Sequence, residues 1–571
     1  MSRRRLLAAV SLLCLLSFVR AQAPFDSGDE RVFFNAKIFT AEPEHPYADA
    51  IAIRGDKIVA VGSRPDVVKA VDKNAEIVDL HSKTLFPGFI DSHAHPIEGG
   101  LTLLSADIGE NVRSVDELAS FAAEAKKNGK GMRGDILVVT GVPLMFWSRP
   151  DELNARFSSG AYADQAVFFE GMDGHTGWAN RALLRRAGIT KDFLSHLSEG
   201  ERKYYGYTAG LEPNGFGVDA GLAKIRATMP PPSAERLRNA GRAALRYNHS
   251  LGITAWLDAV ADEPTLAAYK ALSDGGELTA HIAALPRIEP RNDPQRELAR
   301  VQGLRQQFGG VRNLSIPGLK VFADGVLEFP SQSAALLKPY RNTGKNGDLL
   351  FDPARFAQLV IAADKLGLIV HIHAIGDLAV RESLNGIEAA RRANGAGGPP
   401  HTITHLQLVD PADIPRFAQL GVIAAFQLYW AAANADAIDI VQPYIDPAIF
   451  PLQYPARSLL DSATIISGAS DWPVSTANVF EAIYQAETRK GPKGVLNADQ
   501  CMPREAMFYA YTRNSARALA MQDRIGSLAP GKQADMVLLD RDVLTVSPEE
   551  MRGTKVLWTM AAGKTAYRAE R

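Results

Sequence analysis

The stretch Leu85-Phe-Pro-Gly-Phe-Ile-Asp-Ser-His-Ala-His95 ends an apolar run with two histidines, His93 and His95. On a β-strand, side chains at positions i and i+2 project from the same face, so both imidazoles can reach one metal ion. His-x-His pairs also occur on half-buried strands that bind no metal, and this stretch alone does not choose between the two interpretations. The decision depends on which other residues the fold brings to the same place.

Seven more apolar segments are typical of β-strands, and helix-like stretches rich in Ala, Leu, Arg and Glu separate most of them. Together with residues 85–95 they give eight strands, the number in a (β/α)₈ TIM-type barrel. The sequence therefore predicts an α/β barrel over residues 85–525. The seven segments are residues 252–259, 280–286, 318–325, 368–377, 401–406, 421–427 and 464–471.

Two further units are expected outside the regular barrel. Residues 99–249 are too long for a single crossover and contain their own strand candidates, residues 136–141 and 165–170, so we expect a large insertion after the first barrel strand. Residues 31–84 and 526–571 show alternating apolar and polar residues between turns. Neither end looks sufficient alone, so we predict one small β-sandwich domain built from both chain ends.

The N-terminus has the pattern of a secretory signal peptide over residues 1–23. Arg3, Arg4 and Arg5 precede an apolar run from Leu6 to Val19, and small residues follow near Ala21 to Ala23, where we place the cleavage. We expect an exported protein, periplasmic or secreted, by the Sec or the twin-arginine route; an uncleaved anchor is the alternative. No later apolar run is long enough for a membrane span, so none is expected after cleavage.

Composition excludes several classes of protein. The 63 basic and 64 acidic side chains nearly balance, and without a basic run we expect no nucleic-acid partner. Of two cysteines, Cys14 lies in the signal, which leaves Cys501 alone and no intrachain disulfide in the mature chain. The sequence leaves the oligomeric state open, a homo-oligomer included.

Polar residues fall at the carboxyl ends of the expected strands, where the active site of a barrel lies. Each has a plainer interpretation: a histidine can be packed in the core, and an aspartate can cap a helix. Of His371 and His373, which alternate on one strand, we choose His373, which is nearer the strand end. Lys320 would be buried on its strand, and an unpaired buried ammonium is energetically costly. Loss of its proton, or reaction with CO₂ to form a carbamate, would remove that cost. The candidates are His93, His95, Lys320, His373, His405 and Asp471.

Six motifs in this order resemble the amidohydrolase superfamily, specifically the amidohydrolase-3 group with the N-substituted formamide deformylase-like enzymes. The resemblance runs from about residue 31 to the end of the chain. Thr404 departs from the glutamate that the family often has before its strand-six histidine. The motifs are PGFIDSHAH (87–95), DGHTGWAN (173–180), LKVFADG (319–325), HIHAIGD (371–377), THLQ (404–407) and SGASDWPV (467–474).

The resemblance implies a site holding one or two divalent cations, with Zn²⁺ preferred and N6-carboxylysine at Lys320. Asp471 would be the general base and acid as well as a metal ligand, and His175 would stabilise the oxyanion or orient the substrate carbonyl. The implied metal ligands are His93, His95, Lys320, His373, His405 and Asp471. The expected substrate-binding residues are Trp178 and Asn180 in the insertion, and Gln427 and Trp430 just beyond a strand end.

The expected function is metal-dependent hydrolysis of a non-peptide C–N bond in a small-molecule amide, by a hydroxide formed at the metal. Hydrolysis of an N-acyl amino acid or a cyclic amide on the same site is an alternative. A catalytically silent relative that serves as a binding or scaffold protein is an alternative of another class.

Overall fold

The computed structural model describes residues 30–109, 112–171, 176–289, 291–329 and 331–570. The signal peptide expected at residues 1–23 and the expected catalytic residue His175 lie outside these ranges. Among the described residues, no helix combines the length and the apolarity that crossing a membrane requires.

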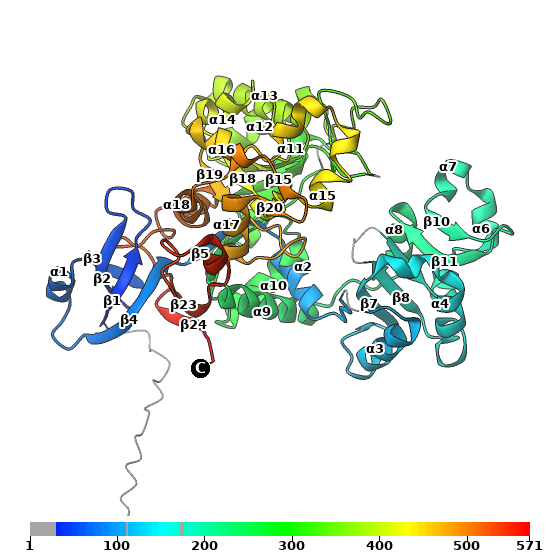
Figure 1. The fold of residues 1–571 in the computed structure, drawn as a ribbon, viewed down its shortest axis with the longest axis horizontal. Coiled ribbons are helices and arrows are strands. Elements are labelled where there is room, and N and C mark those ends of the chain that lie inside the picture. The colour runs from blue at the N-terminus through cyan, green and yellow to red at the C-terminus, as the bar shows by residue number, and fades with distance from the viewer. Residues whose placement is uncertain (1–29, 110–111, 172–175, 290, 330, 571) are drawn as a thin grey trace, which may run out of the picture.

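Both chain ends contribute to one seven-stranded mixed sheet, with the order β24-β23-β22-β4-β1-β2-β3. The N-terminal β1 runs parallel to β4, and the C-terminal β22 is antiparallel to the other edge of β4 (Figure 1). The strands and the two short helices beside them are β1 (Glu30–Phe39), β2 (Tyr47–Arg54), β3 (Lys57–Gly62), α1 (Arg64–Lys69), β4 (Glu76–Pro87), β22 (Met536–Leu539), α20 (Pro548–Arg552), β23 (Val556–Ala561) and β24 (Lys564–Arg568).

This sheet curls on itself, although a sandwich of two sheets was expected. Two strands separate β1 from β23, yet the rings of Phe33 and Trp558 are 6.0 Å apart. Arg31 on β1 also donates a hydrogen bond to the Gly563 carbonyl, after β23. The curl encloses an apolar cluster that includes Phe33, Ile51 and Met536. One sheet therefore covers its own core, which a flat sheet cannot do.

The central part of the chain holds two sheets of parallel strands, as expected for an α/β fold. One has the order β14-β13-β12-β5 and the other β15-β16-β17-β18-β19. All eight expected strand segments contain an observed strand. A ninth strand, β14 (Leu314–Ser315), lies outside those segments. The eight others are β5 (Phe89–Ala94), β12 (Ile253–Asp258), β13 (His281–Ala284), β15 (Gly318–Phe322), β16 (Ile369–Ala374), β17 (Thr402–His405), β18 (Ile423–Phe426) and β19 (Ile466–Gly468).

Backbone hydrogen bonds join the two parallel sheets at both of their seams. At one seam, the amide of Lys320 on β15 donates to the Pro286 carbonyl at 3.0 Å. At the other, the amide of Asp471 donates to the His93 carbonyl, and that of His95 to the Trp472 carbonyl, both at 2.8 Å. The end of β5 is therefore tied directly to the loop after β19.

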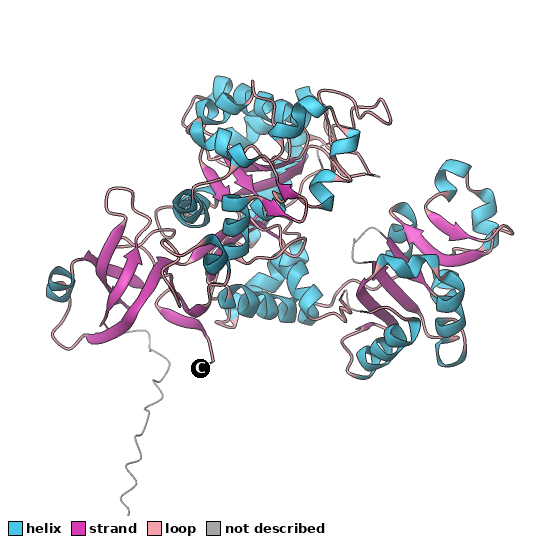
Figure 2. Cartoon of the chain, viewed as in Figure 1, coloured by secondary structure: helices cyan, strands magenta, loops and turns pink. Residues whose placement is uncertain are grey.

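Helices surround these strands (Figure 2). Three begin with the same arrangement: an aspartate N-cap, Asp262, Asp293 or Asp352, accepts an amide hydrogen bond, and proline occupies the first turn. The helices are α2 (Pro96–Leu103), α9 (Ala234–Ser250), α10 (Glu263–Asp274), α11 (Pro294–Gln307), α12 (Pro353–Lys365), α13 (Asp377–Asn394), α14 (Ile414–Leu420), α15 (Ala435–Ile438), α16 (Ala456–Asp461), α17 (Val479–Thr488), α18 (Arg504–Tyr509) and α19 (Ser515–Ala518).

The insertion has its own six-stranded sheet, with the order β10-β11-β9-β8-β7-β6, and lies to one side of the barrel strands in Figure 1. Both strand candidates proposed within it, 136–141 and 165–170, correspond to observed strands. Its elements are α3 (Val115–Lys127), β6 (Met132–Arg133), β7 (Ile136–Val142), α4 (Pro150–Phe157), β8 (Val167–Gly171), β9 (Thr176–Ala179), α5 (Arg181–Arg186), α6 (Lys191–His196), α7 (Glu199–Arg202), β10 (Tyr205–Tyr207), β11 (Pro213–Val218) and α8 (Ala220–Arg226).

This separate unit spans fewer residues than the insertion expected at residues 99–249. Helices α2 and α9 lie against each other, with Ile97 and Ala240 in the same apolar cluster as the barrel strands. The separate sheet begins at Met132 and ends at Val218. Helices at both ends of the expected insertion thus pack with the barrel strands.

Candidate metal centre

Asp471 links the two histidines of the deciding stretch. Its Oδ1 lies 3.1 Å from His93 Nε2 and 3.0 Å from His95 Nε2. Its backbone has a φ of +59°, in the left-handed region that non-glycine residues rarely adopt. Such backbone strain persists only where the surroundings fix it, and it is concentrated at functional sites.

Asp91 holds these two strand ends together from behind. It is buried, and its Oδ1 accepts hydrogen bonds from the amides of His93 at 3.1 Å and Ser470 at 3.0 Å. Its other oxygen accepts from the Ser470 hydroxyl. Burial raises the pKa of Asp91 to about 6, and the hydrogen bonds from Ser470 and His93 oppose that rise. One carboxyl group thus sets the positions of both His93 and Asp471.

His371, which sequence reasoning set aside as a packed histidine, is fully buried but contacts the centre. Its Nε2 lies 2.6 Å from His93 Nδ1, and its Nδ1 bonds the Thr402 hydroxyl. A proton on His93 Nδ1 would be donated to His371, which leaves the Nε2 lone pair of His93 directed toward Asp471. Only the spacing of His371 and His373 hinted at this role.

His405 ends β17 with a φ of +77°. Its Nδ1 lies 3.1 Å from the side-chain oxygen of Gln427, whose amide nitrogen donates to the Thr404 hydroxyl at 3.2 Å. The indole of Trp430 stacks on the His405 ring at 5.6 Å with an interplanar angle of 6°. Gln427 and Trp430 therefore fix the orientation of this imidazole.

His373 sits on the same side as His405, with ring centroids 4.5 Å apart. Its Nε2 is 3.0 Å from the Gly325 carbonyl and 3.5 Å from Asp324 Oδ1. Asp324 accepts amide hydrogen bonds from Ala335, Ile375 and Gly376. It is a structural anchor that the motif LKVFADG contains but that sequence reasoning did not single out.

Lys320 is fully buried, and in the part of the chain that the structure describes its Nζ has no hydrogen-bond partner. Burial lowers its pKa to about 7, although the charge of Asp471 opposes that change. The charge of Lys320 in turn helps burial to lower the pKa of His93, His371 and His405. These imidazoles are held neutral, which is the form that binds a metal.

Asp471, unlike these imidazoles, favours its charged form. Burial opposes the ionisation of Asp471, but its hydrogen bond with His95 and the neighbouring charges lower its pKa. Burial likewise would lower the pKa of His95, but its contact with Asp471 raises it overall. The pair therefore favours an ionised Asp471 beside a protonated His95, while His93, His371 and His405 stay neutral.

These residues fit a divalent metal ion. The ligand atoms that His93, His405 and Asp471 offer all lie within 4.8 Å of one another, and the three side chains are buried. Neutral imidazoles with one carboxylate are a common donor set for transition metals. The side chains of His95 and Asp471 retain 17 % and 10 % exposure, so solvent reaches the centre on their side.

Two expected substrate-binding residues lie in the insertion core instead. Trp178 is fully buried, stacks on Phe169 at 5.6 Å and donates its indole N–H to the Asn214 carbonyl. Asn180 is the N-cap of α5, and its amide group donates to backbone carbonyls, including that of Phe157. Their contacts are those of core and capping residues, and the pocket role that we expected stays a prediction.

Gln427 also differs from the expectation of a substrate contact. It is fully buried, and both ends of its amide are occupied by His405 and Thr404. It acts on the centre through His405 rather than from the solvent side. Trp430, half-buried beside His405, does line the centre.

Comparison with known proteins agrees with the geometry. The model of the amidohydrolase family matches residues 76–567. The chain is 29% identical to the protein LONG AFTER FAR-RED 3 of Arabidopsis thaliana, over 93% of this chain and 91% of that protein. It is 24% identical to the N-substituted formamide deformylase of Arthrobacter pascens, over 94% and 98% of the two chains.

A metal-dependent hydrolase from Pyrococcus horikoshii OT3 has a similar fold. The TM-score is 0.74 at 24% identity, over 91% of this chain and 99% of that one. At this identity the likeness concerns the fold.

Proposed function

The chain belongs to the amidohydrolase family, and we propose that it hydrolyses a non-peptide C–N bond of a small-molecule amide at the centre formed by His93, His95, His405 and Asp471. The single observation that carries the proposal is the convergence of buried imidazoles, with His93 and His405 neutral, on one ionised carboxylate next to Lys320, whose Nζ has no hydrogen-bond partner among the described residues. We also propose that the two parallel sheets close into one (β/α)₈ barrel. The hydrogen bonds at both seams support this closure.

The protonation state of each side chain in the centre determines its proposed role. A bound divalent metal, which we take to be Zn²⁺, would polarise the amide carbonyl and lower the pKa of water. His93, His95, His373 and His405 would hold it through neutral nitrogens. Asp471, kept ionised, accepts the proton of the attacking water and delivers it to the leaving nitrogen, which departs as an amine.

Lys320 is proposed to carry a carboxyl group derived from CO₂. Its pKa of about 7 leaves roughly half of the amine neutral at neutral pH. The Nζ lone pair then forms a bond to the carbon of CO₂ and one proton leaves, which gives a carbamate anion. That anion would satisfy an otherwise unpartnered buried nitrogen and could bridge two cations.

The substrate class within this chemistry is a separate proposal. The deformylase of Arthrobacter pascens acts on N-substituted formamides, according to its name, and that resemblance favours a small amide here. Acyl amino acids and cyclic amides present the same carbonyl and leaving nitrogen, so they remain the alternatives. Trp430 offers an apolar face to the substituent beside His405.

Elemental analysis of protein purified without chelators tests the proposal. We expect one or two zinc ions per chain in the native protein and a sharp loss in Lys320→Ala, with turnover of at least one member of a panel of formamides, acyl amino acids and lactams. Lys365→Ala, at an exposed lysine on α12, is the matched control. Absence of bound metal after incubation with zinc and bicarbonate would overturn the proposal and favour a binding protein.

We further propose that residues 1–23 direct export to the periplasm or beyond. The supporting observation is the sequence pattern alone, a basic start followed by an apolar run and small residues. N-terminal sequencing of the protein from periplasmic or culture fractions should find a start just after Ala21 or Ala23. An intact N-terminus in the cytosol would contradict it.

A further inference from the structure

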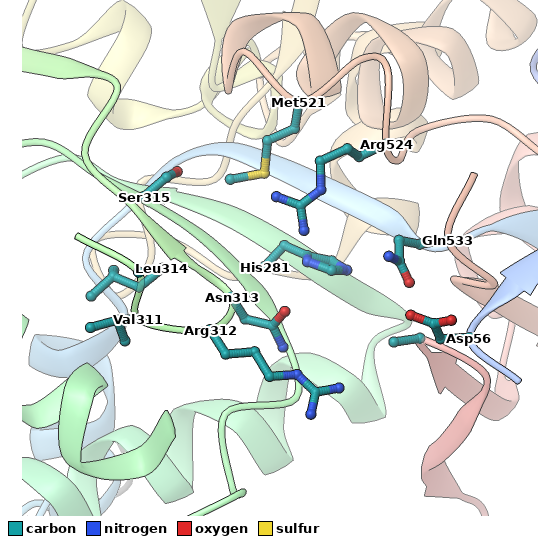
Figure 3. A pocket seen from close by; sticks show the side chains of 12 residues that line it. Asp56, His281, Val311, Arg312, Asn313, Leu314, Ser315, Met521, Arg524 and Gln533 are labelled. Atoms are coloured by element: carbon teal, nitrogen blue, oxygen red, sulfur yellow. The ribbon is translucent and has the colours of Figure 1, made fainter. Parts of the chain in front are cut away.

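Figure 3 shows a cavity of about 340 Å³. It lies at the opposite end of the parallel strands from the metal centre. It is lined at His281, the first residue of β13, whereas His93, His373 and His405 lie at the carboxyl ends of β5, β16 and β17. The other walls come from the turn between β2 and β3, the loop before β14, the segment after α19 and the turn between β23 and β24. Barrel strands and both chain ends therefore meet around it, and its volume is in the range of small-molecule sites.

His281 is the buried polar group of this cavity. It is 1% exposed, and neither ring nitrogen has a hydrogen bond among the described residues. Its Nε2 lies 3.0 Å from Asp535 Oδ2, but that oxygen also lacks an aligned hydrogen bond. Buried polar side chains are nearly always hydrogen-bonded. Among the described residues His281 has only the poorly aligned carboxylate of Asp535 beside it, so its ring can take a further partner from the cavity.

Two arginines line the same cavity. Within the described residues, the guanidinium groups of Arg312 and Arg524 take part in no ion pair or hydrogen bond, and both side chains are exposed. Figure 3 shows the Arg524 guanidinium turned toward the imidazole of His281. Asp56 contributes the one carboxylate of the lining, so the charged side chains sum to one net positive charge.

We propose that this cavity binds a small molecule that bears an oxyanion, a carboxylate or a phosphate, held by Arg524, Arg312 and His281. The planar fork of a guanidinium matches two oxygens of either group, and a ring N–H would supply a further donor from the buried side. The site is separate from the metal centre and does not depend on the proposed hydrolysis. Because its walls come from the barrel and from both chain ends, the occupied form also resists thermal unfolding better.

Calorimetric titration of the full-length metal-loaded protein with inorganic phosphate and, separately, with succinate tests the site. We expect one of the two probes to bind, and Arg524→Gln and Arg312→Gln each to weaken that binding by about tenfold or more, the loss typical of one charge-assisted hydrogen bond. Arg355→Gln, at an exposed arginine of α12, removes the same charge elsewhere and should leave binding unchanged. Both cavity arginines are exposed, so these variants should fold.

Anions can also bind to a metal ion at the metal centre. The variant Asp471→Asn changes the metal centre and leaves the cavity intact, so it distinguishes binding at the two sites. Binding that survives in this variant but falls in Arg524→Gln assigns the anion to the cavity, and the tighter probe tells phosphate from carboxylate. Binding equal in both arginine variants and the parent, or binding lost in Asp471→Asn alone, overturns the proposal. So does the absence of binding by either probe at concentrations up to about 10 mM, which is weaker than ordinary ligand recognition.

Discussion

Replacement of Gln427 by leucine should weaken metal binding although Gln427 is not itself a ligand. Its side-chain oxygen, 3.1 Å from His405 Nδ1, is the acceptor that fixes which nitrogen of His405 keeps its proton. Leucine has a similar volume but no acceptor, so His405 can rotate or change tautomer. Loss of such a supporting partner typically costs 10–100-fold in metal affinity, about 1.4–2.7 kcal/mol.

Competition with a chromophoric chelator measures that affinity directly. The metal dissociation constant of Gln427→Leu should rise within this range, and kcat should recover when zinc is in excess. Thr404→Val is the matched control, because it removes the other hydrogen bond of the same amide but leaves the acceptor for His405. Its metal affinity should change by much less.

The competing interpretation is that Gln427 touches the substrate. It predicts an unchanged metal affinity in Gln427→Leu with a raised KM for the amide. That pattern would refute the argument from burial, since a fully buried side chain cannot meet a substrate without rearrangement.

Three further predictions follow from the same structure. Asp471→Asn should abolish turnover while thermal unfolding stays cooperative, and near-normal activity would refute the site. Asp364→Asn should destabilise the protein by about 3–5 kcal/mol at neutral pH, because it leaves the Arg391 charge buried without its partner. Burial opposes ionisation of Asp364, but its hydrogen bond from His401 and the nearby charges lower its pKa. In chemical denaturation, the free energy of unfolding of the wild type should therefore exceed that of the variant above about pH 4. The difference should shrink as the pH falls through that lowered pKa. Trp178→Ala should cost about 3–5 kcal/mol in the stability of the insertion while KM changes little, and a raised KM at unchanged stability would restore its pocket role.

Much of the barrel region could be predicted because its signals are local. Each buried parallel strand is a short apolar run. The i, i+2 spacing of His93 and His95 brought both to one centre, although β5 ends at Ala94 and His95 is the N-cap of α2 rather than a strand residue. The pairing of the chain ends was also predictable in kind, since neither end carries enough strands to cover a core. The curl that lets Phe33 meet Trp558 was not, because it depends on contacts more than 500 positions apart in sequence.

The residues whose observed contacts differ from the expected ones share one physical cause. An aromatic and an amide beyond a strand end have the same local pattern whether they face a substrate or a core, and Trp178 and Gln427 were assigned by that pattern. Only their partners, the Asn214 carbonyl and His405, distinguish the two cases, and neither partner is a sequence neighbour. The helix α9 raises the same problem, because its apolar face does not reveal which core it covers.

The centre is organised by groups that would never touch a metal or a substrate. Asp91 sets the backbone of His93 and Ser470, His371 sets the tautomer of His93, and Gln427 does the same for His405. Each is buried, so its hydrogen bonds face little competition from water and hold the ligands before any metal arrives. Affinity for the metal should therefore depend on these supporting residues nearly as much as on the ligands, which is why a change at Gln427 tests the site more sharply than removal of a ligand does.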